Sequence, residues 1–94
     1  MKIKDIVANT GNIYIKGVIK EIEVPREFNK FGKSGKVCNA ILADDSGEIM
    51  LTLWNEEADK FEKGQEIEIE NGYAKHYKGD LQLTTGKFGS ITAK

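Results

Sequence analysis

Residues 48–54 alternate between two kinds of side chain, and this alternation constrains the fold more than any other feature of the chain. Successive side chains of a β-strand point to opposite faces. One face of this predicted strand carries Ile49, Leu51 and Leu53, and the other carries Met50, Thr52 and Trp54. The pattern predicts a half-buried strand with Trp54 on the face away from the core. The alternative is that Trp54 covers one end of the fold against the segment that follows.

Four more stretches, residues 13–24, 37–43, 66–75 and 81–88, have the spacing of strands. In the first of them, the apolar positions change from odd to even near Gly17, because two odd-numbered isoleucines give way to Val18, Ile22 and Val24. Such a change of parity needs a bulge or a sharp bend, and glycine permits either. We therefore expect a long first strand, bent at Gly17, with these three residues on its apolar face.

The later strands are predicted to place one row of side chains in the core. This row consists of Cys38, Ala40, Leu42, Ile67, Ile69, Leu81 and Leu83. A bulge at Asn71 and Gly72 is expected to turn Tyr73 outward and Ala74 inward. In the last strand, Gln82 is expected to face outward.

The connections have the composition of turns and one short helix. Pro25 and two glycines predict a loop with a mobile tip over residues 25–35, and residues 44–47 predict a tight hairpin turn. Residues 55–63 predict a helix with Asn55 as its N-cap, and Ala58 and Phe61 three positions apart on its apolar side. Residues 1–11 are a lead-in, in which Ile3, Ile6 and Val7 form either one helical turn or a capping strand. The last six residues are expected to fray.

The predicted order is strand, loop, strand, turn, strand, helix, strand, turn, strand. We therefore expect an all-β fold, a five-stranded OB-fold Greek-key barrel with a short helix between strands 3 and 4, in which residues 1–94 form one domain. Such barrels bind oligonucleotides across strands 2 and 3, with the loops after strands 1 and 4. Those two loops are basic and aromatic in this sequence.

The net charge of −1 conceals a division between segments of opposite charge. Residues 25–36 hold four basic residues against one glutamate, and residues 73–88 hold three lysines, including Lys87, against one aspartate. Residues 55–70 hold seven carboxylates against two lysines, which the predicted helix and the solvent face of a strand explain. A locally basic surface attracts phosphates even on a nearly neutral protein, although the same lysines also serve as ordinary solubilising surface.

Large aromatic side chains lie beside polar or basic neighbours rather than within apolar runs. Trp54, Tyr73 and Tyr77 have this setting, which leaves their rings available to stack on a nucleobase. Phe28 and Phe31 lie in the basic segment, either as anchors folded onto the barrel or as contacts for a ligand.

Other classes of function find little support in the sequence. The sequence has one histidine, His76, and one cysteine, Cys38, which is predicted to be buried. Neither lies at the spacing from another side chain that a nucleophile and its base require, so an enzyme is not expected. No metal site and no cofactor is predicted. No apolar run approaches the length of a membrane span, and a cytoplasmic, nucleoid-associated protein is expected.

Several stretches resemble archaeal single-stranded-DNA-binding proteins, both the crenarchaeal simple type and the OB domains of euryarchaeal replication protein A. The resemblance rests on Asp45-Ser46-Gly47, Leu51-Thr52-Leu53-Trp54, Glu70-Asn71-Gly72-Tyr73 and Tyr77-Lys78-Gly79-Asp80-Leu81-Gln82-Leu83, and covers most of the chain. It implies that Trp54, Tyr73 and Tyr77 stack on bases. It also implies a partner in single-stranded DNA, a role in replication, recombination and repair, and a place as one domain of a longer replication protein A beside other OB domains.

The predicted interface combines rings with polar groups. The stacking residues are Trp54, Tyr73, Tyr77, Phe28 and Phe31, and the residues for the backbone or other polar contacts are Arg26, Lys33, Lys36, Lys75, His76, Lys78, Thr52 and Gln82. Stacking accepts any base, so little sequence preference is expected. The alternatives are an RNA- or tRNA-binding module and a protein-interaction domain that uses the same aromatic residues.

Overall fold

The computed structural model describes residues 1–93, and for residues 86–88 it describes the backbone alone. A short 3-10 turn, η1, precedes six strands and one helix. The elements are η1 (Ile3–Asp5), β1 (Thr10–Ile22), β2 (Arg26–Lys30), β3 (Lys33–Asp44), β4 (Gly47–Trp54), α1 (Glu56–Lys60), β5 (Glu66–Tyr77) and β6 (Asp80–Ala93).

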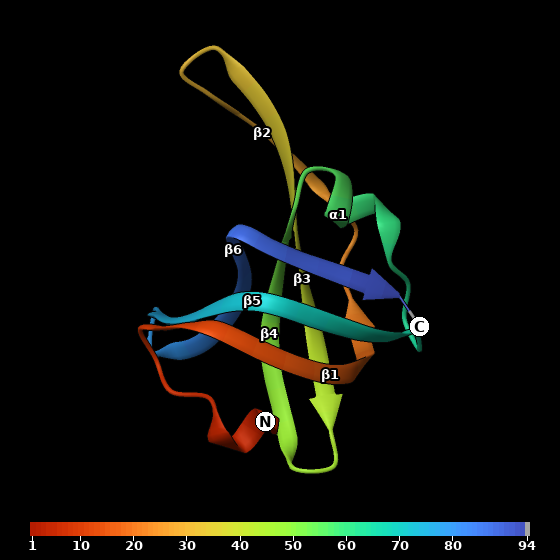
Figure 1. Cartoon of the computed structure of the whole chain (residues 1–94). Coiled ribbons are helices and arrows are strands. Elements are labelled where there is room, and N and C mark those ends of the chain that lie inside the picture. Colours follow the sequence, from red (N-terminus) through yellow and green to blue (C-terminus); the bar gives the residue numbers. More distant parts are fainter. Residues whose placement is uncertain (94) are drawn as a thin grey trace.

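Five strands close into a barrel in the order β1, β5, β6, β4 and β3 (Figure 1). β1 completes the closure because its first part pairs with β5 and its last part pairs with β3. β4 and β6 run parallel, and the other pairs are antiparallel. The predicted all-β, five-stranded OB-fold barrel is confirmed, and the helix lies after the strand that ends in Trp54, as expected.

The core faces of β3, β4 and β5 carry the residues that alternation predicted. These residues are Cys38, Ala40, Leu42, Ile49, Leu51, Leu53, Ile67 and Ile69, and all are buried. The register of β5 and β6 shifts between Glu70 and Gly72, which confirms the bulge that turns Tyr73 outward and Ala74 inward. Ala58 and Phe61 are also buried and pack against this core.

The predicted bend of β1 at Gly17 is wrong. Alternation continues through this residue, so Ile19 is buried while Val18 is exposed, and Val24 is also exposed. A Cβ at Gly17 would lie 2.8 Å from the Ala43 carbonyl oxygen, so glycine is required here for a close approach to β3. Where β1 pairs with β3, the register shift occurs instead between Ile19 and Glu21.

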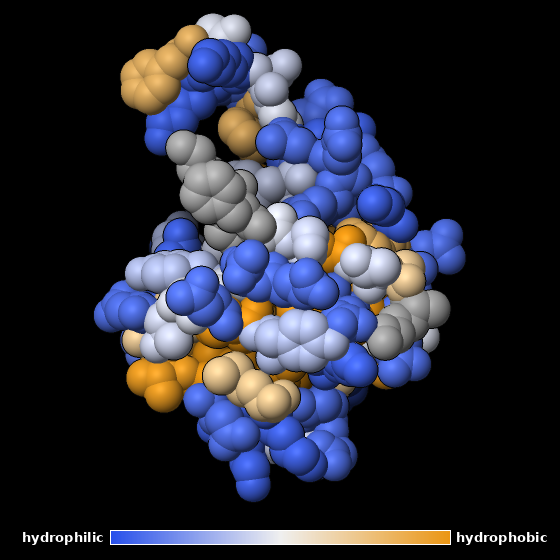
Figure 2. All heavy atoms as spheres, viewed as in Figure 1, coloured by the Kyte–Doolittle hydropathy of each residue, from blue (hydrophilic) through white to orange (hydrophobic). Residues whose placement is uncertain are grey.

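Residues 25–35 form a hairpin arm instead of the expected loop. β2 pairs with the first part of β3, and this arm projects beyond the barrel (Figure 1). Both faces of β2 are exposed, and Figure 2 shows an apolar side chain among hydrophilic ones at the far end of the arm. The arm therefore extends the β3 edge of the outer surface into the solvent.

Two further boundaries differ from the prediction. The helix ends at Lys60, and Asn55 makes no side-chain cap; its Oδ1 instead accepts the Lys36 backbone N–H at 3.3 Å. Residues 89–93 do not fray, because β6 continues alongside β5 to Ala93 and buries Ile91. Ile3 of η1 is buried, and the lead-in thus forms one short helical turn against the barrel.

Candidate nucleic-acid interface

The outer face of β3, β4, β6 and β5 gathers six of the predicted binding residues, namely Thr52, Trp54, Tyr73, Lys75, Tyr77 and Gln82. Trp54 ends β4 and follows Leu53, which is fully buried, so alternation directs the indole outward. On β5, the bulge at Gly72 sets Tyr73, Lys75 and Tyr77 on the same outer face. Two ring-bearing strands are thereby joined through β6, which lies between them.

Among the described side chains, two contacts hold the Trp54 ring. Its Nε1–H donates to Thr84 Oγ1 at 3.2 Å, and Phe28 meets it edge to face with 5.9 Å between ring centroids. The Phe28 ring lies across Gly35, where a Cβ would stand 2.7 Å from the Phe28 Cζ. Trp54 nevertheless remains 41% exposed, so its orientation is fixed while part of its surface is open to a ligand.

The rings of β5 are also open. Tyr73 is 39% exposed and pairs across β5 and β6 with Thr84, the residue that accepts the Trp54 indole N–H. Tyr77 is 54% exposed, and the Lys78 ammonium lies 5.4 Å from its ring centroid. Trp54, Tyr73 and Tyr77 therefore each present aromatic surface on this side of the barrel.

A groove of about 270 Å³ joins several of these side chains. Its lining residues are Arg26, Val37, Asn39, Thr52, Trp54, Lys75, Tyr77 and Gln82. Two rings and two cations thus share one hollow with three polar side chains. Tyr73 does not line this groove and lies beside it, through its pairing with Thr84.

The arm carries the predicted residues that lie farthest from the groove. Phe31 is 92% exposed in the turn after β2, and the Lys30 ammonium lies 5.6 Å from its ring centroid. Lys33 begins β3 next to this turn. Of the two predicted phenylalanines, only Phe28 contacts a ring of the groove.

Three other predicted residues, Lys36, His76 and Lys78, lie apart from the groove. Lys36 binds Asp59 of α1 at 2.7 Å, and this hydrogen bond followed by the charge of Asp59 raises the pKa of the lysine. His76 lies between Lys75 and Tyr77 on β5, so alternation turns it to the opposite face. Lys78 lies at the turn into β6, beyond the groove-lining residues.

The floor of the groove is a hydrogen-bonded set of polar side chains. Gln82 Nε2 donates to Thr52 Oγ1, and Thr52 Oγ1 donates to Asn39 Oδ1 at 3.2 Å. Thr52 and Gln82 are buried although they lie on the outer face, because they cover each other. Sequence reasoning missed Asn39, since its pairing with Thr52 depends on the β3–β4 register.

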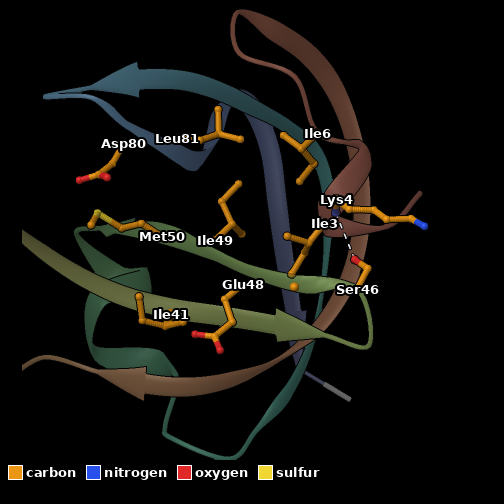
Figure 3. Close-up of a pocket in the computed structure, with 11 residues that line it drawn as sticks. Ile3, Lys4, Ile6, Ile41, Ser46, Glu48, Ile49, Met50, Asp80 and Leu81 are labelled. Atoms are coloured by element: carbon orange, nitrogen blue, oxygen red, sulfur yellow. Dashed lines mark hydrogen bonds between the residues drawn. The ribbon is translucent and has the colours of Figure 1, made fainter.

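A larger hollow lies elsewhere. It has a volume of about 610 Å³ and lies between η1, the β3–β4 hairpin and the start of β6 (Figure 3). Figure 3 shows mainly aliphatic side chains around it, with the Lys4 backbone N–H bonded to Ser46 Oγ at 3.1 Å. No aromatic residue lines this hollow, so it offers nothing on which a base could stack.

The described residues provide no other set of chemical groups that suggests a site. Among them, no group of three metal-ligating side chains occurs, and no helix has the length and hydrophobicity to cross a membrane. Cys38 is buried, and burial raises the pKa of its thiol, whose Sγ–H donates to the Glu23 carbonyl at 3.0 Å. The outer groove is therefore the candidate site.

Comparison with known proteins gives a match to one family over most of the barrel. The family model described as "OB-fold nucleic acid binding domain" matches residues 13–89. The chain is 27% identical over 85 residues to the single-stranded DNA binding protein Ssb of Saccharolobus solfataricus, covering 90% of this chain and 57% of that protein. It is 31% identical over 91 residues to replication factor A of Methanothermobacter thermautotrophicus, covering 93% of this chain and 12% of that protein.

A solved structure gives the same result for the fold. The second OB-fold domain of replication protein A from Methanococcus maripaludis superimposes with a TM-score of 0.82 at 29% identity, over 99% of this chain and 92% of that domain. The resemblance to archaeal single-stranded-DNA-binding proteins that the sequence suggested is thus confirmed. This chain spans little more than half of the first relative's length and about an eighth of the second's.

Proposed function

We propose that this chain, which belongs to the family of OB-fold nucleic acid binding domains, binds single-stranded DNA with little sequence preference. The observation that carries the proposal is that Trp54 and Tyr77 share one groove with Arg26 and Lys75. Rings that stack on bases, beside cations that contact phosphates, are what binding to an unpaired strand requires. The names of the two relatives support the same function.

Binding proceeds by electrostatic capture followed by stacking. Arg26 and Lys75 attract the phosphate backbone to the groove, and Lys33 and Lys78 extend the cationic surface along the arm and the β5–β6 turn. Bases then stack on Trp54 and Tyr77, with Tyr73 beside them. Each stacked base contributes roughly 1–3 kcal/mol by alanine substitution.

Duplex DNA is a poor ligand for this surface. In a duplex the base faces are stacked on one another and cannot lie on Trp54 or Tyr77. The groove is also short, and an OB fold covers on the order of 4–16 nucleotides. We therefore expect one domain to bind a few unpaired nucleotides near the low end of that range.

The proposed context is DNA replication, recombination and repair in the cytoplasm, at the nucleoid. Other OB domains or replication and repair proteins are the expected partners, and the domain acts as a binding module without catalysis. These proposals rest on the relatives named single-stranded DNA binding protein and replication factor A.

A competition titration tests this function. The protein is titrated with matched single-stranded DNA, single-stranded RNA and duplex DNA of one sequence, and Trp54, the single tryptophan, reports binding through its fluorescence. We expect quenching by the DNA strand, with the duplex bound at least tenfold more weakly. Tighter binding of the RNA strand would favour the RNA-binding alternative, because the 2′-hydroxyl then contributes. Failure to bind any strand at low salt would favour a protein-interaction domain.

A further inference from the structure

The hydrogen-bonded floor of the groove is built into the sheet. The chain of bonds runs from Gln82 on β6 through Thr52 on β4 to Asn39 on β3. Thr52 is 3% exposed and Gln82 is 8% exposed, so their side chains are held by their surroundings. Buried polar groups that are fully paired keep a defined orientation. The floor therefore presents its remaining polar atoms to the groove in fixed positions.

The direction of these hydrogen bonds is set by two neighbouring acceptors, Asn39 Oδ1 and Met50 Sδ. The Thr52 hydroxyl has one hydrogen, which it donates to Asn39 Oδ1, so it accepts from Gln82. The Gln82 Nε2 also lies 3.8 Å from the Met50 Sδ, and a thioether accepts hydrogen bonds but cannot donate them. The opposite orientation would place the Gln82 carbonyl oxygen against that sulfur. The amide nitrogen of Gln82 thus faces the floor.

Two atoms of the floor remain available to a ligand. Gln82 Oε1 and Asn39 Nδ2 have no partner among the described residues. Within that same part of the chain, every side-chain nitrogen or oxygen atom that is itself buried has a partner, so these two unpaired atoms must reach the surface. Both residues line the groove, so a ligand bound there lies beside their amide groups. One is an acceptor and the other is a donor.

Lys75 adds a second donor on the other side of Gln82. The β5–β6 register pairs Lys75 with Gln82, and both line the groove. From β3 to β5, the groove therefore offers the Asn39 amide N–H, the Gln82 carbonyl oxygen and the Lys75 ammonium. This order is donor, acceptor, donor.

We propose, on the basis of the function proposed above, that Asn39, Gln82 and Lys75 read the imide edge of thymine or uracil at one nucleotide position. That edge presents acceptor, donor, acceptor through O2, N3–H and O4, which is the complement of the groove. Cytosine presents donor, acceptor, acceptor, guanine presents acceptor, donor, donor, and adenine lacks the third group. A single reading position adds a preference to a strand that is otherwise held by stacking.

Thr52 acts in this reading as a positioning residue. Its hydroxyl fixes the amides of Asn39 and Gln82 without being exposed itself. Without that hydroxyl each amide could rotate and exchange its oxygen with its nitrogen. Thr52→Val should therefore weaken the preference for thymine while leaving stacking on Trp54 in place.

Methylation of the base at N3 tests the proposal without removing the stacking surface. Oligo-dT is compared with the same strand containing N3-methylthymine, with Trp54 fluorescence as the readout. A bidentate base contact discriminates by about 1–3 kcal/mol, so we expect the methylated strand to bind about fivefold more weakly or worse. Oligo-dC and oligo-dA should also bind more weakly than oligo-dT. A comparison of oligo-dU with oligo-rU then distinguishes a base carried by a DNA strand from the same base carried by an RNA strand.

Three variants separate edge reading from a steric effect of the methyl group. Gln82→Met should bring the affinities for oligo-dT and for its N3-methylated form to within twofold of each other. Asn39→Ala, at a half-buried position, should have the same effect. Thr92→Val, an exposed change on β6 outside the groove, should keep the wild-type difference. Circular dichroism melts identify any variant that fails to fold.

The outcomes distinguish this proposal from the function on which it rests. Equal affinity of the wild type for oligo-dT and its methylated form would overturn edge reading while leaving single-strand binding intact. A penalty for the methylated strand that persists in both Gln82→Met and Asn39→Ala would also overturn edge reading. Absence of binding to every strand would overturn both proposals.

Discussion

Phe28 and Trp54 meet edge to face, with their ring planes at 87° and their centroids 5.9 Å apart. The contact joins β2, in the arm, to the end of β4, in the barrel. Edge-to-face pairs contribute about 0.5–1.5 kcal/mol beyond the area that they bury. This contact therefore orients the indole before a ligand arrives, and it depends on the absence of a side chain at Gly35.

Gly35→Ala should displace Phe28 and weaken binding to oligo-dT by several fold. The new Cβ would lie 2.7 Å from both the Phe28 Cζ and the Asn55 Oδ1, so the ring must move away from Trp54. Anisotropy of a labelled oligonucleotide measures the affinity. Gly47→Ala is the control, because its Cβ would meet nothing nearer than 4.0 Å and should leave affinity unchanged. Equal affinities for both variants would mean that Phe28 does not prepare the site.

Trp54→Ala should weaken binding to oligo-dT by about tenfold or more, which lies within the range for one stacked base. The side chain is 41% exposed, so the unfolding midpoint should change little. The loss of the tryptophan removes the fluorescence signal, and anisotropy of a labelled strand replaces it. Tyr14→Ala is the control, an exposed tyrosine on the outer face of β1. If Trp54→Ala binds as tightly as the wild type, the proposed site is wrong.

Asp44 should make the fold sensitive to acid. Burial acts to raise the pKa of this carboxyl, but hydrogen bonds from the Ser46 hydroxyl and from the N–H groups of Ile3, Ser46 and Gly47 outweigh it and lower the pKa to about 2. A depressed folded-state pKa stabilises the protein above the ordinary pKa of 3.8, and this stabilisation is lost as the pH falls toward 2.

Urea unfolding at pH values between 5 and 2 tests whether the stability falls with pH in this direction. The midpoint of the wild type should fall steadily below about pH 4, whereas Asp44→Asn should start lower and fall less over the same range. Parallel midpoint curves for the two proteins would assign the acid sensitivity to other carboxyls.

The alternation of apolar and polar residues predicted the strands correctly wherever the inward and outward positions carried clearly different side chains. It placed Leu53 inside and Trp54 outside, and the structure confirms both. It failed in β1 because Gly17 occupies a core position without an apolar side chain, so the run of apolar residues seemed to change faces at Val18. It also missed β2, because both faces of that strand are exposed and carry no hydrophobic pattern.

The site was predictable only where the position of a residue on its own strand was enough to place it. Trp54 and Lys75 follow from their position on strands, and the groove contains both. Asn39 looks like an ordinary outward polar residue until the register sets it opposite Thr52. The position of Lys36 depends on its pairing with Asp59, a residue of α1 that lies far along the chain. Contacts between distant segments leave no local signal in the sequence.

Lys75→Ala and Lys36→Ala should have different effects on salt-dependent binding. Lys75 lines the groove, so its loss should reduce affinity several-fold and lower the slope of log K against log salt concentration by about 0.7, the value for one phosphate contact on a single strand. Lys36 is bound to Asp59 at 2.7 Å and does not line the groove, so its loss should leave the slope unchanged and the affinity within twofold. Titrations from 20 to about 200 mM salt measure both quantities. Equal slopes for the two variants would move the phosphate path out of the groove and toward α1.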